Sequence, residues 1–230
     1  MRAPTIRELT RLWQASRRRL RLMTVAPELR GADQAIRWCR QRGVLASLGH
    51  SDADARTAQE AVARGARAVT HVFNGMRPLH HRHGALIDVA LTQPRLTTMV
   101  IADGVHVSHE ALRLLVRAKT VGRIALVTDS IRRQGWDVVA RGGAYYTRRG
   151  ILAGSRLTMM EAVKRMVTAC GVPLADAVRM ASEVPARLVH LASRGTLRVG
   201  ARADLVVFDR TFRVLLTVVG GRVVYQRKGL

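Results

Sequence analysis

Short apolar runs alternate along this chain with segments whose apolar side chains recur at helical spacing. Five runs, each short enough for a buried strand, lie at residues 20–25, 44–48, 68–70, 97–102 and 124–128. The segments between them that match a helical period are residues 34–42, 54–64 and 108–119. This alternation of strand and helix predicts an α/β fold with a parallel sheet and right-handed crossover connections.

The five predicted strands run into polar residues of kinds that bind metals or move protons. In chain order these residues are Glu28, His50, His71, His106 and Asp129. In a β/α barrel the carboxyl ends of the strands meet at one mouth, where the chemistry takes place. One histidine in such a position is more often an ordinary loop residue, but its repetition favours a shared site. We favour a barrel over the alternative, a doubly wound open sheet, since no glycine-rich phosphate loop follows a strand.

The character of the sequence changes near residue 195. Apolar runs at residues 203–209, 214–219 and 222–225 predict small antiparallel strands. We expect residues 1–194 to form an incomplete TIM-like β/α barrel, and residues 195–230 to form part of a small β-sandwich. A complete barrel takes roughly 250 residues. We therefore expect the N-terminal strands of the barrel to be missing, and the chain to be a fragment of a longer protein.

The chain carries a formal net charge of +23, with a sequence pI of about 11.8. A charge of this size is typical of proteins that bind nucleic acid. Here it comes from 36 arginines and only 3 lysines, spread along the chain, and only 4% of the residues are aromatic. This distribution predicts no specific nucleic-acid partner, although a basic nucleic-acid-binding protein stays open as an alternative.

Other features of the composition predict a protein of the cytoplasm. The sequence has no run of 18 apolar residues and no apolar leader segment, so we expect neither membrane spanning nor secretion. Cys39 and Cys170, the two cysteines, lie inside predicted helices and are expected to be reduced thiols rather than a disulfide.

Eight short motifs, in order along nearly the whole chain, resemble the N-acetylglucosamine-6-phosphate deacetylases of the amidohydrolase superfamily. They lie at residues 24–28, 48–53, 70–76, 101–106, 127–129, 152–159, 185–187 and 200–205. The resemblance implies the C-terminal portion of an enzyme that removes acetate from N-acetylglucosamine 6-phosphate in amino-sugar catabolism. It also implies a barrel of the metal-dependent hydrolase type, one divalent metal, usually zinc, a phosphorylated amino-sugar substrate and a homodimer.

The resemblance implies roles for individual residues as well. His50 and His71 match two metal ligands, and Asp129 matches an aspartate that moves a proton from the attacking water to the leaving amine. The residues that match substrate contacts are Asn74, Gly75, Arg82, His106, Ala153, Gly154 and Ser155. Of these, Arg82 matches an arginine that reaches a phosphate across a dimer interface, and residues 153–155 match a loop over the sugar.

Departures from the family pattern leave three hypotheses open. The family's third metal ligand is a glutamate in a His-x-Glu-Gly-Pro motif, which this sequence lacks; Glu28 is a candidate to replace it. Residues 80–84 appear one residue shorter than the family's arginine segment, and residues 130–136 replace a stretch rich in alanine and glycine. The chain is an active deacetylase, a catalytically inactive remnant or half of a split deacetylase, or a basic nucleic-acid-binding protein.

Overall fold

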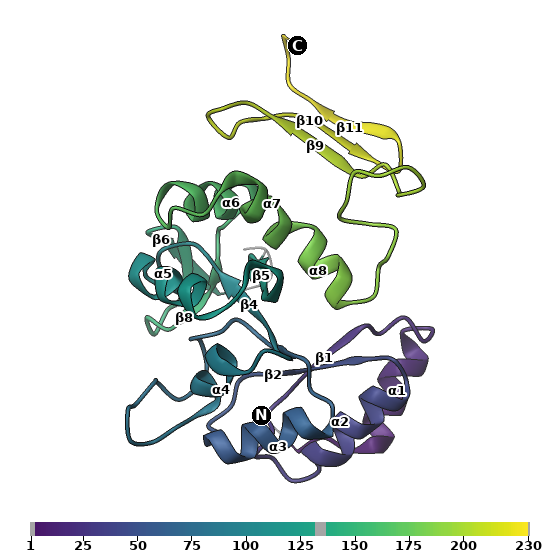
Figure 1. Cartoon of the computed structure of the whole chain (residues 1–230), viewed down its shortest axis with the longest axis vertical. Coiled ribbons are helices and arrows are strands. Elements are labelled where there is room, and N and C mark those ends of the chain that lie inside the picture. The colour runs from purple at the N-terminus through teal and green to yellow at the C-terminus, as the bar shows by residue number, and fades with distance from the viewer. Residues whose placement is uncertain (1–2, 132–136, 230) are drawn as a thin grey trace. The chain divides into compact units, whose positions relative to one another are not determined.

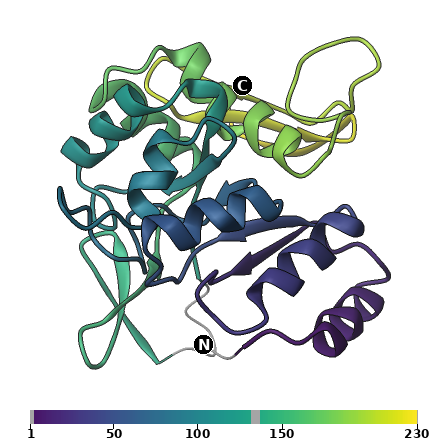
Figure 2. The ribbon, with the colours of Figure 1, turned by 60° about the horizontal axis from the view of Figure 1, so that its bottom comes forward.

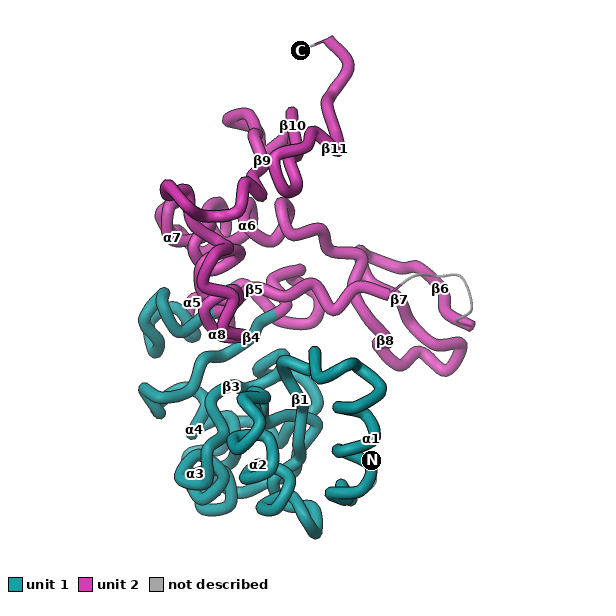
Figure 3. The backbone as a smooth tube through the Cα atoms, turned by 90° about the vertical axis from the view of Figure 1, so that its right-hand side faces the viewer, with its two compact units in different colours: residues 1–100, 114–124 teal, residues 101–113, 125–230 magenta. Residues whose placement is uncertain are grey.

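The structure, a computed structural model, describes residues 3–131 and 137–229. It divides into two compact units (Figure 3). Unit 1 comprises residues 1–100 and 114–124, and unit 2 comprises residues 101–113 and 125–230. This division does not follow the domain boundary expected after residue 194, which stays a prediction.

Unit 1 contains the regular alternation that the sequence predicted. Its helices and strands are α1 (Ile6–Ala15), β1 (Leu22–Val25), α2 (Ala32–Gln41), β2 (Leu45–Leu48), α3 (Ala55–Arg64), β3 (Ala68–Val69), α4 (Leu86–Thr92) and most of β4 (Thr97–Ile101). A 3₁₀ turn, Val121–Arg123, precedes β5 (Ile124–Val127). Helices α1, α2 and α3 lie on the same side of strands β1 and β2 (Figure 1).

Strands β1 to β5 form one sheet, in that order. Neighbouring strands from β1 to β4 pair in parallel, and Leu22 lies opposite Leu45 while Ala68 lies opposite Thr97. Every residue of β2, β3 and β4 is buried, as expected for a parallel sheet that is covered on both faces. The predicted α/β class and its five strands are therefore confirmed.

Local sequence signals explain where the helices of unit 1 begin and end. The hydroxyl of Thr5 accepts a hydrogen bond from the Glu8 N–H at the start of α1, and the carboxylate of Asp54 accepts one from Thr57 at the start of α3. Both residues thus satisfy N–H groups that have no partner within the helix. Gly65 ends α3 with a φ of 129°, a conformation that favours glycine.

Unit 2 combines helices with two antiparallel sheets. Its elements are the first half of α5 (His109–Ala118), most of β5, β6 (Val138–Arg141), β7 (Ala144–Thr147), β8 (Leu152–Ser155), α6 (Met159–Thr168), α7 (Leu174–Ala181), α8 (Glu183–Leu188), β9 (Leu205–Phe208), β10 (Val214–Val219) and β11 (Arg222–Gln226). Strands β6–β8 form one three-stranded sheet, visible in teal in Figure 2, and β9–β11 form the other. The last three strands confirm the prediction from sequence.

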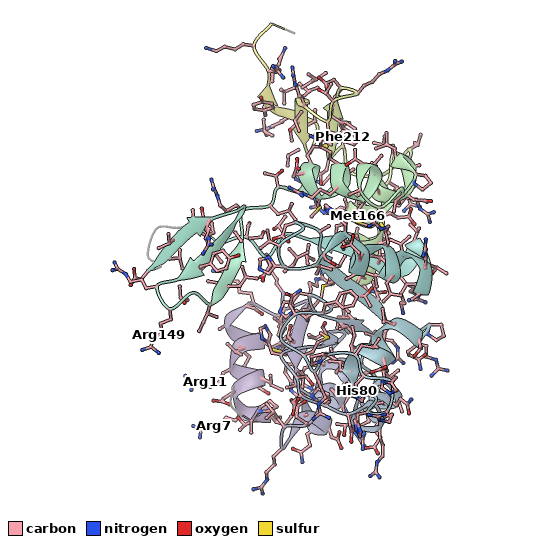
Figure 4. The ribbon with its side chains drawn as sticks, turned by 90° about the vertical axis from the view of Figure 1, so that its left-hand side faces the viewer. Arg7, Arg11, His80, Arg149, Met166 and Phe212 are labelled. Atoms are coloured by element: carbon pink, nitrogen blue, oxygen red, sulfur yellow. The ribbon has the colours of Figure 1, made fainter. Side chains whose placement is uncertain are left out.

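Many arginines of both units are solvent-exposed. Arg7 and Arg11 project from α1, and Arg149 projects from the turn between β7 and β8 (Figure 4). Within the part of the chain that the structure describes, no helix is long and apolar enough to cross a membrane.

Candidate metal and substrate site

Two histidines at the ends of adjacent strands of unit 1 face each other. His50 follows β2 and His71 follows β3, and their Nε2 atoms are 2.8 Å apart. The two rings are nearly perpendicular, with an interplanar angle of 88°. Both residues have positive φ values, 50° and 28°. Such values are rare for residues other than glycine and often mark functional sites. The fold thus brings together the two predicted metal ligands.

The hydrogen bond of His71 to the main chain determines which ring nitrogen carries the proton. Its Nδ1 lies 3.2 Å from the carbonyl oxygen of Asn74. A carbonyl only accepts, so Nδ1 is the donor and Nε2 of the neutral ring keeps its lone pair. His71 is buried, with 7% of its surface exposed. A metal-binding histidine usually has this arrangement, in which one ring nitrogen donates to a main-chain oxygen.

Glu28 is hydrogen-bonded to the loop that carries His50. Its two carboxylate oxygens accept hydrogen bonds from the Ser51 hydroxyl and from the Asp52 N–H, both at 2.7 Å. Asp52 in turn accepts two hydrogen bonds from the Arg77 guanidinium, at 2.9 and 3.0 Å, and this contact lowers the pKa of the Asp52 carboxyl. The hydrogen bonds of Glu28 are therefore directed to the loop and not to the histidine pair.

An open pocket of about 460 Å³ lies beside His50 in unit 1. Its lining consists of Glu28, His50, Ser51, Asp52, Gly75, Met76, Arg77 and Pro78. Gly75 has a φ of 59°, and a Cβ atom there would lie 3.1 Å from Nδ1 of His50. The absence of a side chain at Gly75 therefore lets the loop after β3 approach the histidine closely.

The predicted phosphate ligands of unit 1 do not all line this pocket. Asn74 adjoins Gly75, but its side-chain amide donates to the carbonyl of Val72 at 3.4 Å. Arg82 lies on an exposed loop, where its N–H donates to Nδ1 of His80 at 3.2 Å. The ring of His80, labelled in Figure 4, stacks on two neighbouring histidine rings at 4.8 Å. Arg82 is not among the residues that line the pocket.

Asp129 lies just after β5, in unit 2, with an exposed side chain and a φ of 48°. Its carbonyl oxygen accepts a hydrogen bond from the Ser155 N–H at 3.0 Å. The Ser155 hydroxyl donates to the carbonyl of Thr128 and accepts from Leu157 N–H. Ser155 thus ties β8 to the end of β5.

Residues 153–155 lie on strand β8 rather than on the loop that the resemblance implied. The difference arises because β8 pairs with β7. A Cβ atom at Gly154 would lie 3.1 Å from the Asp129 carbonyl oxygen, so Gly154 permits the close approach of the two segments. Of the unusual segment 130–136, residues 132–136 lie outside the described residues.

His106, also in unit 2, is hydrogen-bonded to Asp103. Its Nδ1 lies 2.6 Å from one Asp103 carboxylate oxygen, and both side chains are almost fully buried. The other oxygen of Asp103 accepts the N–H groups of Val105 and His106. Burial raises the pKa of Asp103, but these hydrogen bonds outweigh it and hold that pKa below its ordinary value. Sequence reasoning assigned no role to Asp103, although the spacing Asp-Gly-x-His after a strand is a local signal that could have found it.

The described residues, 3–131 and 137–229, contain no group of three or more His, Cys, Asp or Glu side chains that could hold a metal ion. Two imidazole nitrogens converge in unit 1; in unit 2 a carboxylate follows β5, and a third histidine, His106, is held by a buried carboxylate. This combination of parallel strands and strand-end ligands is typical of metal-dependent hydrolases built on β/α barrels.

The chain belongs to the amidohydrolase family, whose sequence model matches residues 3–224. Among curated relatives, it is 38% identical over 220 residues to the N-acetylgalactosamine-6-phosphate deacetylase of Escherichia coli O157:H7. It is 39% identical over 225 residues to the N-acetylglucosamine-6-phosphate deacetylase of Homo sapiens. The matches cover 91% and 90% of this chain but only 58% and 54% of the two relatives.

Solved structures show the same relationship. The chain is similar to N-acetylglucosamine-6-phosphate deacetylase from Thermotoga maritima, with a TM-score of 0.90 and 30% identity over 98% of this chain and 64% of the other. A variant of the Mycobacterium smegmatis deacetylase, solved with N-acetyl-D-glucosamine-6-phosphate, gives a TM-score of 0.91 and 34% identity, over 97% and 62% of the two chains. The fold is therefore that of the amidohydrolase barrel with its small β-sheets.

Proposed function

We propose that this chain contributes the metal-binding and substrate-binding residues of a deacetylase. The reaction converts N-acetylglucosamine 6-phosphate and water to glucosamine 6-phosphate and acetate. The observation that carries the proposal is the pair of Nε2 atoms, 2.8 Å apart, of His50 and His71. The similarity to deacetylases supports the choice of reaction. Because the chain spans 54–58% of the two curated relatives described above, activity of the 230 residues alone must be tested.

The histidine pair suits a divalent metal, and we propose zinc. Imidazole nitrogens are common zinc ligands, and the hydrogen bond from His71 Nδ1 to Asn74 places the ring proton on Nδ1, so that the lone pair is on Nε2, the atom that faces His50. A catalytic zinc site normally has three protein ligands, of which these histidines would supply two. Glu28 is a poor third ligand, because both of its oxygens accept hydrogen bonds from the His50 loop.

A bound metal would polarise the acetyl carbonyl and make water more acidic. We propose Asp129 as the group that carries the proton. Its carboxylate would take a proton from water as the oxygen attacks the carbonyl carbon, and give it to the nitrogen as the C–N bond breaks. The exposed side chain and the main-chain bond to Ser155 suit this role, because the carboxylate is accessible while its backbone is held.

We assign the remaining predicted residues to substrate binding. Asn74, Gly75 and Arg82 are proposed to bind the phosphate, because N–H groups and a guanidinium make charge-assisted hydrogen bonds with phosphate oxygens. The exposed position of Arg82 suits a contact with the substrate of a second copy in a homodimer. His106 and residues 153–155 are proposed to contact the sugar. We place this activity in the cytoplasm.

Two measurements on the purified chain test the proposal. Elemental analysis after dialysis should give about one zinc per chain, and the His50→Ala variant should lose it. Acetate release should then be measured with the 6-phosphates of N-acetylglucosamine and N-acetylgalactosamine, since relatives act on either sugar by name. Asp129→Asn should abolish turnover while keeping zinc. Zinc without turnover would favour a remnant or one half of a split enzyme, and absence of zinc would contradict the metal site.

A further inference from the structure

The loop after β4 holds a buried carboxylate against a buried imidazole. Only 4% of the Asp103 side chain and 6% of the His106 side chain are exposed. The distance of 2.6 Å between His106 Nδ1 and Asp103 Oδ2 is typical of a charge-assisted hydrogen bond. These two residues are separated by only two positions, so the contact is built into one tight loop.

Among the described residues, the hydrogen-bond partners of the Asp103 carboxylate are all nitrogens. Oδ1 accepts from the N–H groups of Val105 at 2.8 Å and His106 at 2.7 Å, while Oδ2 faces the imidazole. A carboxylate that accepts two main-chain N–H groups is stabilised in its ionised form. An ionised carboxylate can only accept, so the proton in the contact with His106 belongs to Nδ1 of the ring.

This loop approaches α5 and α6 closely at Gly104. Gly104 has a φ of 73°, and a Cβ atom there would lie 3.2 Å from His109 Nε2 and 3.3 Å from an Arg165 guanidinium nitrogen. Arg165 also lies 3.3 Å from the Glu161 carboxylate. The titratable side chains around the loop are therefore His109 on α5 and the Arg165–Glu161 pair on α6, all within unit 2.

We propose that Asp103 is a positioning residue that fixes His106 in the Nδ1–H tautomer and presents Nε2 as a hydrogen-bond acceptor to the substrate. Nε2 of His106 has no hydrogen-bond partner recorded among the described residues, and in the neutral ring this atom carries a lone pair. The group that fits it is a donor, such as a sugar hydroxyl or an amide N–H. The identity of the substrate rests on the function proposed above, but the tautomer does not.

Replacing Asp103 by Asn provides a sharp test, because Asn is almost the same size but has one acceptor and one donor group. If the Asn oxygen takes the place of Oδ1, it keeps both backbone hydrogen bonds and turns its NH₂ group toward His106. The opposite orientation would oppose NH₂ to two N–H groups and lose both bonds. The first orientation is therefore favoured, and it requires His106 Nδ1 to accept and Nε2 to carry the proton.

The experiment is long-range ¹H–¹⁵N NMR of the full chain labelled in its histidines, with the His106 signals assigned by the His106→Gln variant. The pH is raised until the His106 ring is neutral, and its tautomer is read from the ring nitrogen shifts. We expect the Nδ1–H tautomer in the unmodified protein and a reversal to Nε2–H in Asp103→Asn. Asp209→Asn is a matched control, because Asp209 in the same unit also accepts main-chain N–H groups, and it should leave His106 unchanged.

An Nε2–H tautomer in the unmodified protein would overturn the proposal even if Asp103→Asn fails to fold, and so would an unchanged tautomer in folded Asp103→Asn. Adding N-acetylglucosamine 6-phosphate then separates this proposal from the proposed function. If the sugar phosphate shifts the His106 Nε2 signal in the unmodified protein but not in Asp103→Asn, this supports the contact of Nε2 with substrate. The expected tautomers without any response to the sugar phosphate would keep Asp103 as the residue that fixes the ring, and would overturn its role toward this substrate.

Discussion

The sheet of β1–β5 and the sheet of β9–β11 are built from similarly apolar strands but differ in burial. All four residues of β2 and all five of β4 are buried, whereas every residue of β11 is exposed. Val223 and Val224 of β11 expose 57% and 61% of their surface, although Leu48 of β2 exposes none.

The difference between the two sheets comes from their connections. In the parallel sheet each of β1 to β4 is followed by a helix, as parallel pairing requires, and α2 contacts both β1 and β2. Strands β10 and β11 are joined by a two-residue turn at Gly220 and Gly221, which provides no such cover. An apolar run therefore predicts a strand, while the length and content of the connection decide whether that strand is buried.

Among the substitutions that test this difference in burial, Leu48→Ala in β2 is expected to lower the unfolding free energy most. Leu48 is fully buried, so the variant loses apolar contact and leaves a cavity, at a cost of about 2–5 kcal/mol of unfolding free energy. Val224→Ala in β11 is the matched control and should cost less than about 1 kcal/mol, because the side chain is mostly exposed. Urea denaturation measures both, and equal losses would contradict the contrast in burial.

Gly49→Ala, at the end of β2, should cost somewhat less. A Cβ atom at Gly49 would lie 2.8 Å from the Cβ of Thr70, and Thr70 is held by hydroxyl contacts with Thr24 at 3.0 Å and Ser47 at 2.7 Å. Overpacking of this kind costs about 1–3 kcal/mol. The variant should also displace His50 and weaken zinc binding, as titration calorimetry would measure. Unchanged stability together with unchanged zinc affinity would show that the strand end adapts freely.

Lys119 makes the stability of unit 1 depend on pH. Its ammonium group donates to the carbonyls of Gln93 and Leu96 at 2.7 and 2.9 Å. Burial, and to a smaller degree Arg123, lowers its pKa from 10.5 to about 8. Between these values the folded protein releases the proton while the unfolded chain keeps it, so the free energy of unfolding should rise with pH, by about 1–3 kcal/mol in total.

Thermal unfolding of Lys119→Met provides the control for this pH dependence. Burial raises the pKa of Cys39 from 9.0 to about 11, which lowers stability with rising pH in that range. Both proteins contain Cys39, so its effect cancels when the melting temperature of Lys119→Met is subtracted from that of the unmodified protein. The rise in stability with pH that Lys119 causes should then be seen in the unmodified protein only. A difference that does not change between pH 8 and pH 10.5 would contradict the lowered pKa of Lys119.

Much of the fold could be predicted from sequence, and two omissions have physical reasons. Helix α4 was not predicted because five of its seven residues are buried, so apolar residues surround the helix and no periodic face stands out. Strand β6 was not predicted because three of its four residues are exposed and no apolar run marks it.

Some features of the candidate site could likewise be predicted from sequence, and others could not. The strand-end histidines could be predicted, because each follows an apolar run. The hydrogen bonds of Glu28 to Ser51 and of Arg77 to Asp52 join residues 23 and 25 positions apart, and a single sequence gives no sign of such pairs. The contact between Asp103 and His106 spans three positions and is accessible to sequence reasoning.

The smallest effect on stability is expected from Arg77→Ala, because Arg77, like Val224 in β11, has an exposed side chain. Arg77 pairs with Asp52 through two hydrogen bonds, but 39% and 78% of the two side chains are exposed, and exposed ion pairs contribute little to folding. The melting temperature should therefore stay unchanged at physiological salt, as for Val224→Ala. Zinc affinity should fall by about tenfold, because Arg77 connects the loop that carries His50 to the loop after His71. A lower melting temperature with unchanged zinc affinity would mean that this pair stabilises unit 1 instead of orienting His50.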